Sequence, residues 1–340
     1  MAVVSTLCAA MCAVGLSAQN SPPGGFSLVV DFMALDSRGH PITDLRADEI
    51  VVRVGRETAN IRGLRLLPAA AAIGGPVERS RTLAFGSVEA ANFERSFLVV
   101  VDDESLPQGS EQSTREAIRS FLTRLDARDR VGLVVVPHGD VRILPTTDHG
   151  RVIQSVQRIS GRAMGRESAA DAACRTRNVL RELDTLLMAA EGPTGPLTLV
   201  LFSGSMYDGG GAIQAPLGTS MACDVQLSDF RQLGLRASRS RGYIYIVQPE
   251  TFGGLPWTSS PRSGLEQLAG VTGGRILQLS GRDHDVLNQL TLETSAVYVA
   301  QITLEDQPRS VQTLGVKTSR PTVTIVARPH VTMPGDGVPR

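Results

Sequence analysis

The middle of the chain alternates between short apolar runs and longer amphipathic stretches. Continuous apolar runs are typical of strands that are covered on both faces of a parallel sheet, and apolar residues at i, i+3, i+4 and i+7 are typical of helices. This alternation predicts an α/β fold over residues 95–294, a Rossmann-type parallel sheet with helices on both faces. Its four central strands are expected at residues 97–101, 131–136, 197–202 and 243–247.

Shorter strand patterns punctuated by turns flank this region, at residues 26–67 and 296–332. Neither segment is large enough to form a stable sheet alone. We therefore expect the two halves to join as one small, discontinuous β-sandwich domain in which the α/β domain is inserted. Residues 68–94, which begin with small residues, Pro and Gly, are the expected linker.

Three local signals predict helix ends. Ser113 and Glu116 have the spacing of a capping box, which places a helix start at Ser113. Asp148 is an expected N-cap of the helix that follows it. Gly273 and Gly274 form a C-cap signal at the end of a helix over residues 264–271.

The first residues read as an export signal. Residues 2–18 carry no charge and end in small residues, with an expected cleavage after Ala18. The alternative is an N-terminal membrane anchor, since about 17 residues is the lower limit for a span. We predict an exported protein, periplasmic or extracellular, with no membrane span in the mature chain.

Four cysteines are present, and Cys8 and Cys12 would leave with the signal. Cys174 and Cys223 remain, and neither lies in a C-x-x-C motif, so a zinc site is not expected. In an exported chain they form either one disulfide or two separate buried thiols.

Composition and missing motifs weigh against several functions. Lys+Arg and Asp+Glu are both 34, which disfavours nucleic acid as a partner because phosphates need a basic surplus. No P-loop is present, and the sequence around Ser203 lacks the glycines of a nucleophile elbow. Lys317 is the only lysine and lies outside the α/β core, which disfavours enzymes that need a lysine there.

Polar residues follow two of the predicted strands. Asp102, Asp103, Glu104 and Ser105 end the first strand, and Ser203 ends the third. Ligands of open α/β sheets bind at the carboxyl ends of the strands, an edge that we call the rim. Acids and hydroxyls suit Mg²⁺ or Ca²⁺. The alternative is an acidic cluster that is solvated at a helix N-terminus, where the helix dipole favours it.

The order of segments resembles a known family. The α/β part resembles a von Willebrand factor A (VWA) domain, and residues 26–330 as a whole resemble the VWFA-related proteins that are abundant in Acidobacteria. The resemblance is carried in order by VVDFMALDSRGHPITDLRADEIVVRVGRE, RSFLVVVDDESL, FLTRLDARDRVGLVVV, GLEQLAGVTGGRIL, and TSAVYVAQITL followed by VTIVARP.

The resemblance implies a metal-ion-dependent adhesion site, in which D-x-S-x-S, a distant Thr and a late Asp hold one divalent cation. This chain departs from that pattern, because neither Asp102 nor Asp103 is followed by both serines and Ser203 stands where the late Asp is expected. Ser168 and Thr176 are the candidates for the distant hydroxyl. The implied site of Asp102, Asp103, Ser105 and Ser203 is degenerate, with weak or absent Mg²⁺ or Ca²⁺ and no other cofactor.

The same resemblance places Cys174 and Cys223 beside the rim, where a disulfide would pin the loop of residues 207–222. We predict an exported, non-catalytic, adhesion-type interaction module that binds a protein or peptide at the rim. The residues expected to contact that partner are Glu104, Tyr207, Asp208 and Trp257. The alternatives are a metal-dependent hydrolase that uses residues 102–105, and a structural component of an envelope or secretion assembly.

Overall fold

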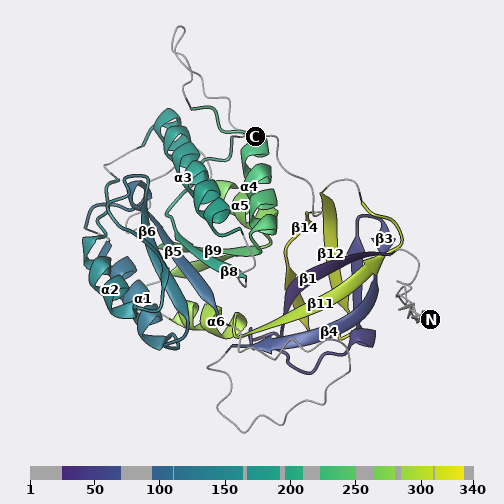
Figure 1. The fold of residues 1–340 in the computed structure, drawn as a ribbon. Helices are drawn as coiled ribbons and strands as arrows, with labels where there is room; N and C mark the ends of the chain where they lie inside the picture. The colour runs from purple at the N-terminus through teal and green to yellow at the C-terminus, as the bar shows by residue number, and fades with distance from the viewer. Residues whose placement is uncertain are drawn as a thin grey trace, which may run out of the picture.

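A computed structural model describes residues 25–69, 94–109, 111–163, 167–191, 196–209, 223–249, 263–279, 285–308 and 311–332. Figure 1 shows two units, an α/β unit formed by the middle of the chain and a β unit formed by both of its ends. The expected signal segment, most of the expected linker and Trp257 lie outside the described residues. Within the described residues, no helix combines the length and apolar character needed to cross a bilayer.

One six-stranded sheet forms the centre of the α/β unit. Its strands lie in the order β10-β9-β8-β5-β6-β7, and all are parallel except the edge strand β7. The four apolar runs predicted as central strands are β5, β6, β8 and β9, so the prediction of a parallel sheet is confirmed. The strands are β5 (Ser96–Asp102), β6 (Arg130–Val136), β7 (Arg142–Thr146), β8 (Leu197–Phe202), β9 (Gly242–Pro249) and β10 (Arg275–Leu279).

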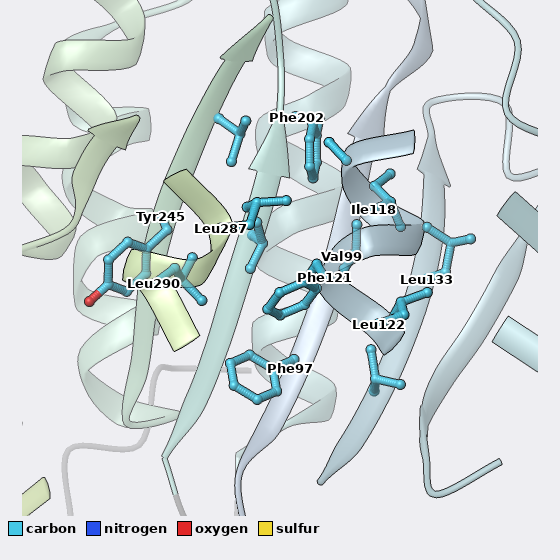
Figure 2. Packing of buried hydrophobic residues seen from close by; sticks show 14 of the residues in the cluster. Phe97, Val99, Ile118, Phe121, Leu122, Leu133, Phe202, Tyr245, Leu287 and Leu290 are labelled. Carbon is cyan, nitrogen blue, oxygen red and sulfur yellow. The ribbon is translucent and has the colours of Figure 1, made fainter. Parts of the chain in front are cut away.

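Helices cover both faces of this sheet. Apolar residues of α1, α2 and α6 pack with one set of alternate strand residues, and those of α3, α4 and α5 pack with the other set. Figure 2 shows the first face, where Phe121 of α1 meets Phe97 of β5 edge-on with ring centroids 5.3 Å apart. The helices are α1 (Glu111–Arg124), α2 (His149–Ser155), α3 (Ala169–Ala189), α4 (Leu227–Arg239), α5 (Ser263–Thr272) and α6 (Asp285–Glu293).

The β unit joins strands from both ends of the chain in two four-stranded sheets, ordered β13-β1-β11-β4 and β14-β12-β2-β3. Residues of both sheets, among them Val30 of β1 and Val52 of β2, share one buried cluster, so the sheets face each other. Each of the two sheets combines strands from residues 26–68 with strands from residues 296–331. The strands are β1 (Phe26–Leu35), β2 (Ile50–Val54), β3 (Glu57–Thr58), β4 (Asn60–Pro68), β11 (Ala296–Leu304), β12 (Gln312–Thr318), β13 (Thr324–Ala327) and β14 (His330–Val331).

Asp31 of β1 ties the two units together. Its buried carboxylate accepts hydrogen bonds from the guanidinium of Arg241 at 2.7 and 2.8 Å and from Arg328 at 3.2 Å. The hydroxyl of Tyr243, on β9, donates to the backbone oxygen of Asp31 at 3.1 Å. These contacts fix the β unit against the amino-terminal end of β9. The rim lies at the opposite, carboxyl ends of the strands, so these contacts do not cover it.

Two of the three predicted helix ends are confirmed. The Asp148 side chain accepts the backbone N–H of Arg151 at 3.1 Å and caps α2, and Gly273 follows α5 with a φ of +69°. The third prediction is wrong, because α1 begins at Glu111 and Ser113 therefore lies inside its first turn. An N-cap must precede the first helical residue, so the Ser113–Glu116 spacing does not act as a capping box here.

Candidate functional site

The rim includes the point at which the direction of strand addition in the sheet reverses, between β5 and β8. From β5 the chain runs to β6 on one side, and later returns through α3 to β8 on the other side of β5. Such switch points are where open α/β sheets bind ligands. Asp102 ends β5 and Ser203 follows β8, and the Ser203 hydroxyl donates to Asp102 Oδ2 at 2.8 Å. The structure thus brings together two of the predicted site residues.

A guanidinium occupies the centre of this site. Arg175 of α3 is 3% exposed, and Asp102 is fully buried. Arg175 Nη1 donates to Asp102 Oδ2 at 2.9 Å and to the backbone oxygen of Ser205 at 2.8 Å, while Nη2 donates to the Ser205 hydroxyl at 3.0 Å. The positive charge that faces Asp102 therefore comes from the chain itself.

Glu167 completes the surroundings of Arg175. Its two carboxylate oxygens accept from Nε and Nη2 of Arg175, both at 2.9 Å, which is the bidentate geometry of a strong arginine–carboxylate pair. The Glu167 side chain is 20% exposed, so it is the outermost acceptor of the group. Arg175 thereby uses all five of its N–H donors.

The charges of this cluster depend on one another. Burial raises the pKa of Asp102, while Arg175 and the hydroxyls of Ser203 and Ser105 oppose that rise. Burial by itself would lower the pKa of Arg175, but pairing with Asp102 and Glu167 outweighs it and raises the pKa above the ordinary arginine value. Arg175 is the member on which the others depend, because its removal would leave the buried carboxylate of Asp102 without a compensating charge.

Asp103 faces a different partner from Asp102. Its Oδ2 accepts from Arg162 Nε at 2.7 Å, and its backbone oxygen accepts the N–H of Arg162 at 2.8 Å. Burial raises the pKa of Asp103 to about 6, against the lowering effects of His138 and Arg162. Asp102 and Asp103 are therefore neighbours in sequence that bind two separate arginines.

Ser105 holds the two rim loops together. Its hydroxyl donates to the backbone oxygen of Asp102 at 2.9 Å and accepts the N–H of Gly204 at 2.9 Å. A Cβ at position 204 would lie 2.7 Å from the backbone oxygen of Ser105, so only glycine allows this approach. The role of Ser105 in the structure is to join backbone segments of the loops that follow β5 and β8.

A disulfide joins Cys174, next to Arg175, to Cys223 just before α4. It links α3 to the segment that leads into α4. Thr176 Oγ1 accepts the N–H of Tyr207 at 2.9 Å, and Ser168 caps α3 by accepting the N–H of Asp171 at 3.1 Å. The two hydroxyls considered for a distant metal ligand thus have structural partners.

The predicted partner-contact residues differ in their accessibility. The Glu104 side chain is 32% exposed and lies 3.0 Å from the His138 ring, and Asp208 is partly buried. The expectation for Tyr207 needs correction, because Tyr207 is 8% exposed and packs in the cluster between the sheet and helices α3 to α5. Trp257 lies outside the described residues.

The site does not fit the divalent cation that the resemblance implies. Asp102 Oδ2 already accepts from Arg175 and Ser203, and a cation there would be repelled by the guanidinium 2.9 Å away. Oδ1 of Asp102 and Oδ1 of Asp103 have no hydrogen-bond partner among the described residues, but each carboxylate is already paired through its Oδ2 with an arginine that would oppose a cation. Across those residues, no group of three or more His, Cys, Asp or Glu side chains is placed to hold a metal ion.

Sequence reasoning missed Arg175, although a signal for it was present. Arg175 precedes Val179 by four positions and Leu183 by eight, so it lies on the apolar stripe of α3 that predicts burial. An arginine on a buried stripe requires an acidic partner. The acids that follow β5 were the available candidates.

The described architecture agrees with the VWA-like fold that the sequence resemblance implies. Solved structures similar to this chain include the VWA domain of SpRpn10, with 12% identity and a TM-score of 0.36, covering 59% of this chain and 96% of that one. They also include the vWF domain of the type V pili tip protein Mfa5 from Porphyromonas gingivalis, with 9% identity and a TM-score of 0.38, covering 58% of this chain and 94% of that one. These likenesses concern the fold alone. No family model matches the sequence, and no curated protein matches it.

Proposed function

We propose that this protein is an exported, non-catalytic interaction module that binds a protein or peptide partner at the rim. The observation that carries the proposal is the Arg175 cluster, which lies where an α/β sheet would place a reactive or metal-binding group. The hydroxyls of Ser203, Ser205 and Ser105 are all engaged in hydrogen bonds to buried neighbours. The carboxylate that Ser203 faces is paired with Arg175, which makes it a weak base and a poor metal ligand, so this pairing disfavours the alternative of a metal-dependent hydrolase at residues 102–105.

The surface around the cluster suits a polar partner. Glu104, His138, Asp140 and Arg162 are all partly exposed, with side chains 32%, 41%, 47% and 39% accessible. A hydrogen bond connects Glu104 to His138, and ion pairs connect Arg162 to both Asp103 and Asp140. A surface of both charges on a rigid scaffold favours specific recognition over non-specific adhesion.

Export is supported by two observations. Disulfides persist in oxidising compartments, and Cys174 and Cys223 are joined. The uncharged segment of residues 2–18 has the pattern of a signal peptide. A mature N-terminus at Gln19, measured by mass spectrometry of the protein recovered from its native host, would establish cleavage. Retention of residues 1–18 would contradict it.

A binding experiment tests the proposed function. The wild-type protein, cross-linked in an extract of the native envelope, is compared with a rim variant, Glu104→Arg with Asp140→Arg. The control is Arg128→Glu, an exposed residue of the turn before β6, at the opposite end of the strands. The proposal expects a partner that the wild type and the control capture and the rim variant loses. Equal capture by all three proteins would contradict binding at the rim.

A further inference from the structure

The acceptors around Arg175 fall into two groups. Asp102 Oδ2, the Ser205 hydroxyl and the Ser205 backbone oxygen come from the ends of β5 and β8, and they accept three of the five hydrogen bonds. Glu167 accepts the other two through Nε and Nη2, which form one edge of the planar guanidinium. One edge of Arg175 is thus held by the sheet, and the other edge is filled by a single side chain.

Glu167 is the exchangeable member of the cluster. Asp102 is fully buried and is also bound by Ser203, whereas Glu167 is 20% exposed and, among the described residues, its carboxylate accepts hydrogen bonds from Arg175 alone. Glu167 comes immediately before Ser168, the N-cap of α3, and therefore lies outside the helix itself. Its removal would leave Arg175 in place, since three bonds to the strand ends remain.

We propose that the Nε–Nη2 edge of Arg175 is a binding site for a carboxylate of the partner, and that Glu167 occupies this site in the free protein. The geometry selects a carboxylate because two parallel N–H donors match its two oxygens. The charge favours a monoanion over a dianion, because a monoanion restores the net charge of the cluster that Glu167 gives in the free protein. A doubly charged phosphate would add one further negative charge beside the buried Asp102.

This inference rests on the proposed function, because the carboxylate belongs to the partner that binds the rim. Glu167 competes from within the chain at high effective concentration, so a free carboxylate binds the wild type poorly. A partner displaces Glu167 when its other contacts with the rim compensate for the exchange. The ion pair between Arg175 and Glu167 therefore breaks only when a partner with matching contacts binds the rim.

Chemical rescue tests the site directly. Glu167→Ala vacates the edge of Arg175, and sodium acetate is the probe, with sodium chloride at equal ionic strength as the reference. We expect acetate to raise the melting temperature of Glu167→Ala by several degrees and to leave that of the wild type unchanged. The control is Glu182→Ala on the same helix, which vacates the exposed Arg142. Equal effects of acetate on the two variants, or no effect on Glu167→Ala, would overturn the proposal; Glu167→Ser, which also vacates the edge, replaces Glu167→Ala should the latter fail to fold.

Short peptides identify the source of the carboxylate. A peptide with blocked ends and one Glu presents a side chain, and a glycine peptide with a free C-terminus presents a chain end, with its amide as the blank. Binding of either peptide to Glu167→Ala supports the site and names its ligand, while binding of neither overturns it. A partner that the rim variant loses but that binds Glu167→Ala no more tightly than wild type refutes this inference and leaves the proposed function standing. Acetate rescue of Glu167→Ala without capture of a rim-dependent partner supports the carboxylate site on Arg175 and contradicts the proposed function.

Discussion

Replacement of Arg175 by alanine is the perturbation with the largest expected effect on the rim. The substitution removes five hydrogen bonds and leaves the Asp102 carboxylate, which is fully buried, with only Ser203 and Ser105 as favourable neighbours. Breaking a buried ion pair by deleting one partner typically costs about 3–5 kcal/mol, because an uncompensated charge remains in a medium that solvates it poorly. We expect a loss of that size in the free energy of unfolding.

Urea unfolding followed by circular dichroism at neutral pH measures this loss. Arg177→Ala is the matched control, because Arg177 lies on the same helix and, among the described residues, makes one exposed hydrogen bond, to the backbone oxygen of Asp224 at 2.7 Å. The control is expected to stay within about 0.5 kcal/mol of wild type. Adding Asp102→Asn to Arg175→Ala removes the stranded charge and should restore part of the stability. A loss below about 1 kcal/mol, or no recovery in the double variant, would refute the role given to Arg175.

Three further perturbations test other parts of the structure. Replacing Cys174 and Cys223 by serine opens a loop of 49 residues and should cost about 4 kcal/mol by loop entropy, measured against the oxidised protein; two free thiols in the native protein would contradict the bridge. Because burial raises the pKa of Asp103 from 3.8 to about 6, the unfolded state ionises first as pH rises. The stability of wild type relative to Asp103→Asn should therefore fall by at most about 3 kcal/mol between about pH 4 and pH 7, and a rise would reverse the assigned sign. Asp31→Asn should lose about 3 kcal/mol or more by stranding Arg328, and an unchanged melting curve would show that Asp31 does not hold the two units together.

The sheet was predictable because its strands are buried on both faces. Residues 97–101, 131–136, 197–202 and 243–247 have no solvent-facing positions, so their sequences are apolar without alternation. The β unit was predictable for a different reason, since each half alone leaves an apolar face without cover. The pairing of β1 with β11 joins the two halves in one sheet, and the second sheet, which also holds strands from both halves, covers its apolar face.

The site was only partly predictable. The acids after β5 and Ser203 after β8 follow from the rule that strand ends converge, and Ser203 does contact Asp102. The sequence does not show which of Asp102 and Asp103 pairs with Arg175, because the answer depends on the residue at which β5 ends. Asp102 is the last residue of β5, and Asp103 begins the 3₁₀ turn Asp103–Ser105. Arg175 is 73 residues away from Asp102, and its approach depends on where α3 crosses the sheet.

The ends of helices show the same limit. Asp148 was predictable as a cap because it is an aspartate one turn before Val152, the first buried apolar residue of its helix. The start of α1 was misplaced because Glu111 and Gln112, both polar, extend the helix upstream of the apolar stripe. An apolar pattern marks the buried face of a helix and carries no information about exposed turns at its end.

The central claim is that a guanidinium, and not a metal ion, supplies the positive charge beside Asp102. The most direct measurement is calorimetric titration of the wild-type protein with Mg²⁺, Mn²⁺ and Ca²⁺ after dialysis against a chelator, together with the melting temperature in each condition. We expect no saturable binding and a melting temperature that neither the chelator nor the cations change. One equivalent of cation bound with sub-millimolar affinity, and lost in Asp102→Asn, would contradict it.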